Sequence, residues 1–294
     1  MTATQALSVP ERIRRSRQSG TAGIGSRPGF LTYGLLTAFL LGSAYPLWWS
    51  FVVASGTNST RGETVPLIPG GNFLANAAKV LDAIPFWKAL GNSILISAII
   101  TISVVTFSTL AGYAFAKLRF KGRDGLMVFV IVTMAIPTQL GIIPLFMLMR
   151  QLGWTGSIGA VIVPTLVTAF GVFFMRQYLV DVIPDELIEA ARMDGANQFR
   201  TFLTVGVPAA RPAMAILGLF TFMTAWTDYL WPLIVLSPQN PTLQTALSQL
   251  QSGFYVDYSI VLAGAVLATL PLLVLFVVAG KQLVSGIMAG AVKG

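Results

Sequence analysis

Residues 259–280 read SIVLAGAVLATLPLLVLFVVAG, a run of 22 residues without a charged side chain. An α-helix rises about 1.5 Å per residue, and about 20 apolar residues cross the roughly 30 Å hydrocarbon core of a bilayer. This run is therefore long enough to span a membrane. It predicts a transmembrane helix and decides the class of protein to which the chain belongs.

Five further runs of this kind precede it. All six are expected as transmembrane helices, over residues 30–54, 90–116, 126–149, 156–175, 212–236 and 259–280. Asp228 is the only charged residue inside them. We therefore expect an all-α membrane protein with six transmembrane helices, and an even number of spans puts both termini on one side.

The composition of the whole chain agrees with this class. Of 294 residues, 55% are hydrophobic and only 10% are charged, which leaves too little polar surface to cover a water-soluble globule. The chain has no His and no Cys. Their absence excludes the usual zinc, haem and iron–sulfur ligand sets, thiol nucleophiles and histidine bases, so we expect no metal site and no catalytic residue.

Lysine and arginine are distributed unequally among the connections. The N-terminal tail holds five, the 117–123 connection four, the 176–211 connection four and the C-terminal tail two, whereas the opposite connections hold four in total. Cytoplasmic connections are enriched in basic residues, so both termini are expected in the cytoplasm of a multi-pass cell-membrane protein. Topology then accounts for the net charge of +8, and no nucleic-acid partner is needed.

Residues 1–28 are rich in Ser, Gly and Arg and are expected to form a basic, disordered cytoplasmic tail before a membrane domain over residues 29–294. Arg14 and Arg15 also fit a twin-arginine signal. The apolar run begins over ten residues later and is longer than a cleavable signal, which favours a retained first helix.

The connection over residues 176–211 is longer than the others. Pro184 and Asp185 predict the start of a helix, and Gly195 suits the left-handed residue that follows a helix end. A helix of about ten residues is not stable alone in water, so it must dock on a surface. Its apolar side is formed by Leu187, Ile188 and Ala191. The surface is either this chain's own bundle or another protein.

The residues of this connection carry a specific resemblance. Residues 188–196 read IEAARMDGA, and Val207 and Pro208 follow. The string, its spacing and its cytoplasmic location resemble the EAA loop of ATP-binding-cassette importer permeases of the maltose-type sugar branch. The resemblance implies that this helix couples the membrane spans to a separate ATPase. The implied coupling residues are Glu189, Ala190, Ala191, Asp194 and Gly195.

Other stretches resemble the same family, namely PFW at 85–87, GYAFAK at 112–117, WTDYLWP at 226–232 and GAVKG at 290–294. The resemblance implies the type I importer permease fold, with a core over about 86–281. It also implies that the C-terminal tail, with Gly290 and Lys293, reaches between two ATPase subunits. A frayed terminus is the alternative by position alone.

As the resemblance implies, the chain is a permease subunit that forms half of the path for a carbohydrate and is not an enzyme. Its implied partners are the lipid bilayer, a second and non-identical permease, two ATPase subunits and an external solute-binding protein. The chain has no G-x-x-x-x-G-K-[ST] string, so ATP and magnesium would be used by the separate ATPase. The sequence does not reveal which sugar is carried.

Candidates for the substrate path are the intramembrane carboxylate, its aromatic neighbours and two amides. They are Asn92, Gln139, Trp226, Asp228, Tyr229 and Trp231. A charge inside a membrane is costly and faces protein or water, and aromatic faces suit a sugar ring. Interfacial anchoring is the alternative for the aromatic residues and Asp228, and helix packing is the alternative for the amides. Pro137 and Pro144 should disrupt the third span.

Two other function classes are weighed against this one. A secondary transporter or channel driven by an ion gradient would need several ionisable residues inside the membrane, and Asp228 is a single one. A membrane-embedded enzyme would need a base for a hydroxyl nucleophile, and no His, Cys or paired intramembrane acid supplies it.

Overall fold

The computed structural model describes residues 29–57, 67–253 and 256–291, with side chains as far as residue 278. All the regular structure among these residues is helical. Contacts along the chain define two compact units, Met1–Trp48 and Trp49–Gly294. Within the described ranges, five helices are long and apolar enough to cross a membrane, or six if a bent pair counts as one span, which confirms the expected fold class.

The smaller unit contributes most of helix α1 (Phe30–Ala54). Its 25 residues coincide with the first expected span, so that prediction is confirmed. No charged residue interrupts the apolar run, and the helix has the limits that the hydropathy pattern predicted.

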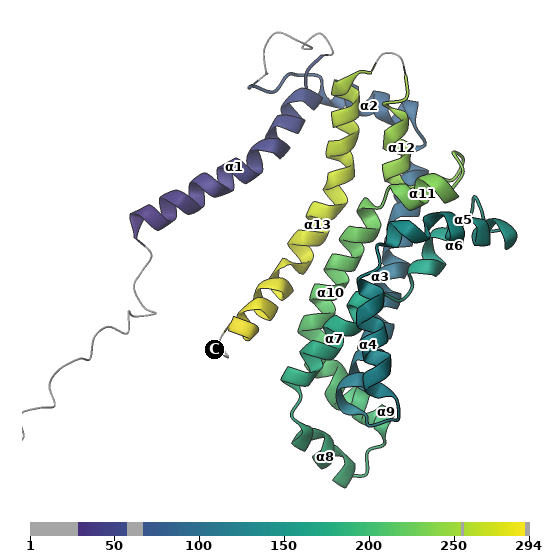
Figure 1. Ribbon diagram of the computed structural model, residues 1–294. Helices are drawn as coiled ribbons and strands as arrows, with labels where there is room; N and C mark the ends of the chain where they lie inside the picture. The colour runs from purple at the N-terminus through teal and green to yellow at the C-terminus, as the bar shows by residue number, and fades with distance from the viewer. Residues whose placement is uncertain (1–28, 58–66, 254–255, 292–294) are drawn as a thin grey trace, which may run out of the picture. The chain divides into compact units, whose positions relative to one another are not determined.

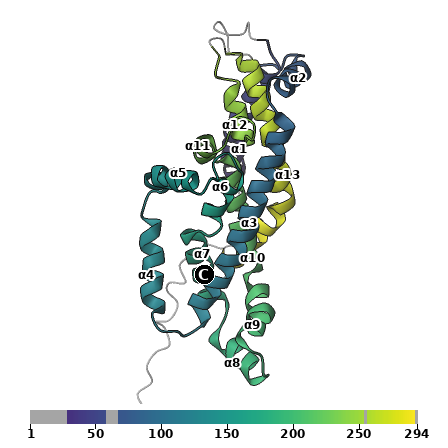
Figure 2. The same ribbon diagram turned by 90° about the vertical axis from the view of Figure 1, so that its right-hand side faces the viewer.

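Three long helices form the centre of the larger unit. Helix α3 (Phe86–Lys117) packs along α7 (Ala169–Val182) and α10 (Val207–Thr227), as Figures 1 and 2 show. The close approach of α3 and α7 requires Gly112, because a Cβ atom there would lie 2.7 Å from the Cβ atom of Met175. Small residues permit such backbone contact between membrane helices.

Short elements extend two of these helices. They are α6 (Gly159–Ile162) and η3 (Val163–Thr165) before α7, and α9 (Gln198–Thr201) and the π-helical turn η4 (Phe202–Gly206) before α10. The fourth span therefore covers Gly159–Val182 instead of 156–175. More of the 176–211 connection is therefore helical than the apolar pattern indicated.

The fifth span differs from the expected 212–236. It begins at Gln198 and ends at Thr227, where Asp228 adopts an extended conformation with ψ 122°. Arg200 and Arg211 remain exposed, so the helix continues past the apolar run into polar surroundings. After the break, α11 (Leu230–Val235) forms a separate short helix.

The third expected span, 126–149, is not one straight helix. It consists of α4 (Arg123–Met134), the 3₁₀ turn η2 (Thr138–Gly141) and α5 (Ile142–Gln151), with a bend of 88°. Pro137 lies at the break in an extended conformation, with ψ 123°. A proline lacks the N–H that the helix needs, so the expected disruption of backbone hydrogen bonding is realised as a sharp turn.

The remaining helices lie at the end of the larger unit opposite to α8 (Asp185–Met193), as both ribbon views show. They are α2 (Phe73–Ala83), α12 (Leu243–Gln249) and the first turns of α13 (Tyr258–Ala291). Helix α13 contains the expected span 259–280 and continues beyond it. The sequence pattern did not predict α2, which contacts α13 and whose Asn76 donates to the carbonyls of Ala54 and Gly56.

Candidate functional site

Helix α8 has the limits that the sequence predicted. It starts after Pro184, which has an extended conformation, and it carries two acids in its first turn. At its end, Gly195 has φ +78°, and the N–H of Ala196 donates to the carbonyl of Ala191. This is the hydrogen bond of a Schellman motif, in which glycine avoids the steric cost of the left-handed conformation.

One face of α8 docks on the bundle. Ile188 is its only buried side chain and joins the main hydrophobic cluster of the larger unit. Leu187 is half exposed, and Ala191 is intermediate, so the expected apolar side is only partly covered. Among the proposed coupling residues, those exposed are Glu189, Ala190, Asp194 and Gly195. Met193 beside them is 88% exposed.

An ion pair ties the first residue of α8 to the last residue of α3. Lys117 Nζ lies 2.8 Å from Asp185 Oδ1, and the lysine side chain is 6% exposed while the aspartate is 73% exposed. The hydrogen bond and the charge of Lys117 lower the pKa of the Asp185 carboxyl below its ordinary value, and Arg119 adds a smaller contribution. Sequence reasoning missed this pair, because 68 residues separate the partners.

The π-helical turn η4 packs on the same end of α3. The rings of Tyr113 and Phe202 meet edge to face with centroids 5.2 Å apart. A Cβ atom on Gly206 would lie 3.0 Å from the Tyr113 ring, so any larger residue there would push the ring from its position. Such π-turns are frequent at functional sites. The 176–211 connection is thus held against α3 at the first residue of α8 and again after α8.

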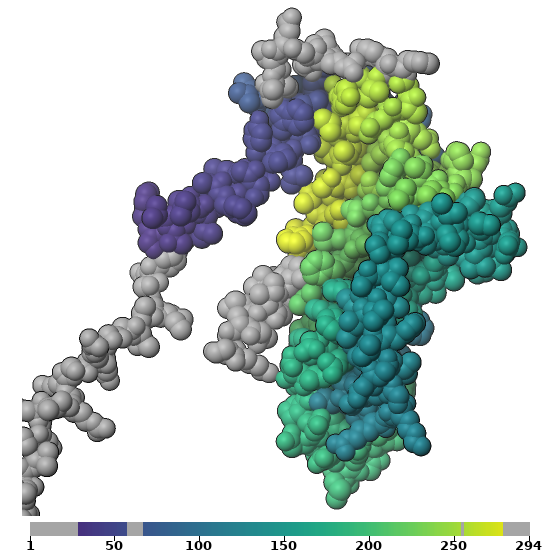
Figure 3. All heavy atoms as spheres, in the orientation of Figure 1, coloured from purple at the N-terminus to yellow at the C-terminus, as the bar shows by residue number. Residues whose placement is uncertain are grey.

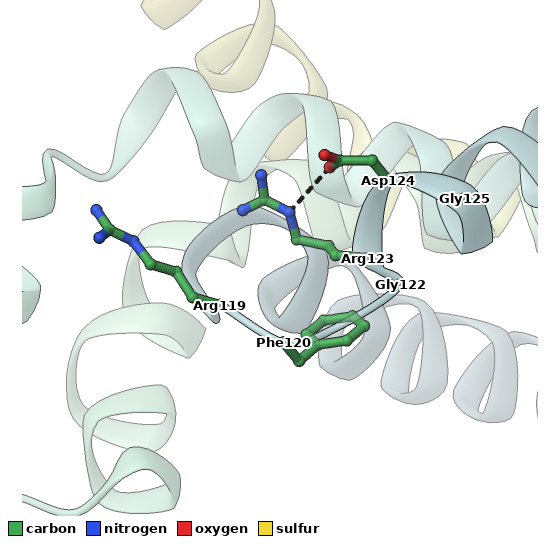
Figure 4. Close-up of a pocket in the computed structure, with 6 residues that line it drawn as sticks. All are labelled: Arg119, Phe120, Gly122, Arg123, Asp124 and Gly125. Carbon is green, nitrogen blue, oxygen red and sulfur yellow. Dashed lines mark hydrogen bonds and ion pairs between the residues drawn. The ribbon is translucent and has the colours of Figure 1, made fainter.

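A surface pocket of about 340 Å³ lies at the turn between α3 and α4. Figure 4 shows its lining, in which the side chains of Arg119 and Arg123 extend to one side of the turn, and Arg123 Nε pairs with Asp124 Oδ1 at 3.1 Å. None of the candidate path residues lines this pocket.

The candidate path residues do not converge within this chain. Asn92, on α3, donates to Asn240 Oδ1 at 3.1 Å and to the carbonyl of Pro241 at 2.8 Å. This geometry favours the helix-packing alternative for that amide. Gln139 lies in η2 at the bend of the third span and is exposed.

The two tryptophans of the 226–232 motif are buried in different clusters. Trp226 is 1% exposed and stacks on Phe222, with ring centroids 5.7 Å apart. Trp231 is 7% exposed, and its Nε1 donates to the carbonyl of Ala160 at 3.1 Å. Both side chains therefore contribute to packing in this conformation.

Asp228 and Tyr229 lie between α10 and α11. The Asp228 carboxylate lies near the backbone N–H groups of Leu230 and Trp231, at the start of α11. Tyr229 is 41% exposed. Of the implied tail contacts, Gly290 belongs to the last turns of α13, and Lys293 lies outside the described residues.

Comparison with known proteins decides the family. Residues 105–287, more than half of the chain, match the model described as "Binding-protein-dependent transport system inner membrane component". The chain belongs to this family. The match begins within α3 and ends within α13, so it includes α8, the broken third span and the 226–232 motif.

Named relatives of this inner membrane component cover nearly the whole chain. The arabinooligosaccharides transport system permease protein AraQ of Bacillus subtilis is 33% identical, over 96% of this chain and all of the relative. The lactose transport system permease protein LacG of Rhizobium radiobacter is 34% identical, over 90% of this chain and 97% of the relative. The resemblance to sugar-importer permeases is thereby confirmed.

A solved structure agrees with this membership. A chain from a bacterial ABC transporter involved in the import of the acidic polysaccharide alginate superposes with a TM-score of 0.72 and 26% identity, covering 85% of this chain and 94% of that one. As an inner membrane component, the chain is a multi-pass transport subunit and not an enzyme. ATP hydrolysis belongs to a separate ATPase subunit of such importers.

Proposed function

We propose that this chain forms half of the transmembrane path for a carbohydrate, an oligosaccharide or a related solute, and that α8 couples the path to a separate ATPase. The observation that carries the proposal is the exposed Glu189 and Ala190 surface of α8, a helix of nine residues in which only Ile188 is buried. So short a helix gains stability from a docking partner. The relatives named for arabinooligosaccharides and lactose support the substrate class.

The orientation of α8 follows from charge. Both termini and α8 would face the cytoplasm, since most basic residues lie in the connections on that side. Glu189 would meet a cationic side chain of the ATPase, Ala190 and Ala191 would permit close approach, and Asp194 with Gly195 would form the turn. ATP and magnesium would bind to the ATPase and not to this chain. Gly290 and Lys293 would extend the contact through the C-terminal tail.

The partners are those of a binding-protein-dependent importer: a second, non-identical permease, two ATPase subunits and an external solute-binding protein. Apolar side chains exposed on α4 and α5 support a covering by lipid and by the second permease, and these helices occupy much of the surface seen in Figure 3. The exposed residues on α4 include Leu126, Val128, Phe129 and Val132.

For the path itself, the exposed candidates Gln139 and Tyr229 are best placed to meet a solute. The other four candidates would support the wall of the path without touching the solute, because each lies against other residues of this chain. They are Asn92, Trp226, Asp228 and Trp231. An importer of this kind completes its path with the second permease, so a complete site is not expected in one chain.

Uptake of labelled oligosaccharide by vesicles tests the proposal. The vesicles would contain this chain, its partner permease and the ATPase, with the binding protein outside. We expect uptake that requires ATP on the ATPase side and is abolished when the ATPase is omitted. Uptake driven by a proton or sodium gradient in the absence of ATP would support the secondary transporter instead and would overturn the proposal.

A further inference from the structure

Lys117 occupies an unusual position for a lysine. It ends α3, its side chain is 6% exposed, and its ammonium group reaches the Asp185 carboxylate at 2.8 Å. Lysine is rarely buried without a partner. The negative end of the α3 dipole and the positive end of the α8 dipole meet at this point, and the cation and the anion each stand at the helix end that favours them.

The position of α8 depends on few contacts. Ile188 fixes one side of the helix in the hydrophobic cluster, and Asp185 fixes its first turn to α3. One buried side chain alone would leave α8 free to rotate about that contact. The ion pair supplies a second point of attachment, and it is directed at α3 specifically.

Helix α3 links this attachment to the opposite end of the unit. Its 32 residues extend over about 48 Å. Near its start, Asn92 donates to the carbonyl of Pro241, and Ser93 Oγ accepts from the N–H of Leu243 at 2.8 Å. Near its end, Tyr113 packs on the π-helical turn. One continuous helix thus contacts both the α8 region and the segment that begins α12.

We infer that Lys117 is a positioning residue for coupling. Through Asp185 it fixes α8 to α3, so that a displacement of α8 by the ATPase moves α3 and with it the segment at 240–243. This inference rests on the proposed function. Without the pair, α8 still offers Glu189 and Ala190 to the ATPase, but its movement is transmitted poorly. Solute import per ATP hydrolysed therefore falls while ATPase binding persists.

The test measures ATP hydrolysis and solute uptake in the same vesicles, using the complete complex. Lys117→Met and Asp185→Asn are compared with Lys121→Met and Asp181→Asn, which remove the same charges from exposed side chains near the pair. We expect the first two variants to raise the ATP consumed per solute by about two- to fivefold, the range of a partly exposed ion pair. We expect the two controls to keep the wild-type ratio of ATP consumed to solute imported. Lys117→Arg, which keeps a cation at this position, should also keep that ratio.

A double-mutant cycle separates positioning from simple loss of structure. The Lys117→Met/Asp185→Asn double variant should have the ratio of the worse single variant and not the product of both effects, because both substitutions break the same pair. Multiplicative effects, or an unchanged ratio in both single variants, overturn the inference. Asp185 is exposed, so its replacement reports on coupling even if Lys117→Met lowers the amount of folded protein.

The outcomes also distinguish this inference from the proposed function. If wild-type uptake does not need ATP, the proposed function fails, and the inference fails with it. If uptake needs ATP and Glu189→Lys abolishes ATPase binding, but Lys117→Met and Asp185→Asn keep the wild-type ratio, then only the positioning role of Lys117 is wrong.

Discussion

Two short helices lie at opposite ends of the larger unit, and their surroundings differ sharply. Helix α12 has seven residues, of which Leu243, Thr245 and Ala246 are buried, and Thr242 with Thr245 forms a capping box. Helix α8 has nine residues, and only Ile188 is buried. The chain itself caps the start of α12 and covers its apolar face, whereas most of the surface of α8 is exposed.

The difference shows which end of the larger unit is covered by contacts within the chain. At the α12 end, Ser93 and Asn92 provide hydrogen bonds from α3, so this segment is fixed by the same chain. At the α8 end, one buried side chain and one ion pair hold the helix, and its acidic and small side chains face outward. An isolated helix of this length is marginal in water, so the α8 surface is expected to be covered by a partner.

The largest expected effect is at the exposed surface of α8. Glu189→Lys should abolish association with the ATPase, because it places a cation where the partner is expected to present one. Gly195→Asp should have the same result, since a side chain at φ +78° costs roughly 1–2 kcal/mol and adds charge at the turn. Co-purification of the ATPase measures this, with Asp181→Lys on α7 as the control. Full co-purification of both variants would remove the coupling role.

The next effect concerns the attachment of α8 to the bundle. Ile188→Ala should destabilise the docked helix by roughly 2–5 kcal/mol, because the removed side chain is 4% exposed in the main cluster. Faster amide exchange within residues 185–193, with unchanged exchange in α3, is the expected result. Exchange that rises equally in both helices would show that α8 is not a separately attached element. Leu187→Ala, at a half-exposed position, is the matched control.

A smaller effect is expected at the α12 end. Ser93→Ala leaves the buried N–H of Leu243 without its acceptor, at a cost of about 1–3 kcal/mol. The thermal unfolding temperature of the purified chain in detergent should fall, while ATPase association stays normal. Ser103→Ala, which removes a hydroxyl that donates to the carbonyl of Leu166, measures the cost of another such bond on α3. If Ser93→Ala lost its association with the ATPase, the assignment of ATPase binding to the α8 end alone would be contradicted.

The smallest stability effect is expected for Asp228→Asn. The amide keeps the size of the side chain and an oxygen near the N–H groups of Leu230 and Trp231, so the stability change should stay below about 1 kcal/mol. Transport decides the role of this residue. Altered uptake at unchanged stability would assign Asp228 to the path, and unchanged uptake would leave it as an anchor of α11.

The sequence predicted local features well. The limits of α1 agree with those of its apolar run. The limits of α8 follow from Pro184 and Gly195, because the residues that start and end this helix act within a few positions. Hydropathy was less successful where a helix leaves the apolar layer. The fifth span starts at Gln198, because the exposed Arg200 and Arg211 can be solvated while the helix continues. A hydropathy pattern shows which residues lie in the apolar layer and not where the helix itself begins.

By itself, the sequence determined that this protein is a helical membrane subunit, which family motifs it carries and where α8 begins and ends. Only the tertiary structure decided the 88° bend in the third span and the burial of Trp226 and Trp231. The same holds for the ion pair of Lys117 with Asp185 and the hydrogen bond from Asn92 to Pro241. The physical reason is distance along the chain. Hydropathy and helix caps depend on residues that are close in the sequence. The contacts named above join residues that are far apart in the sequence and that only helix packing brings together.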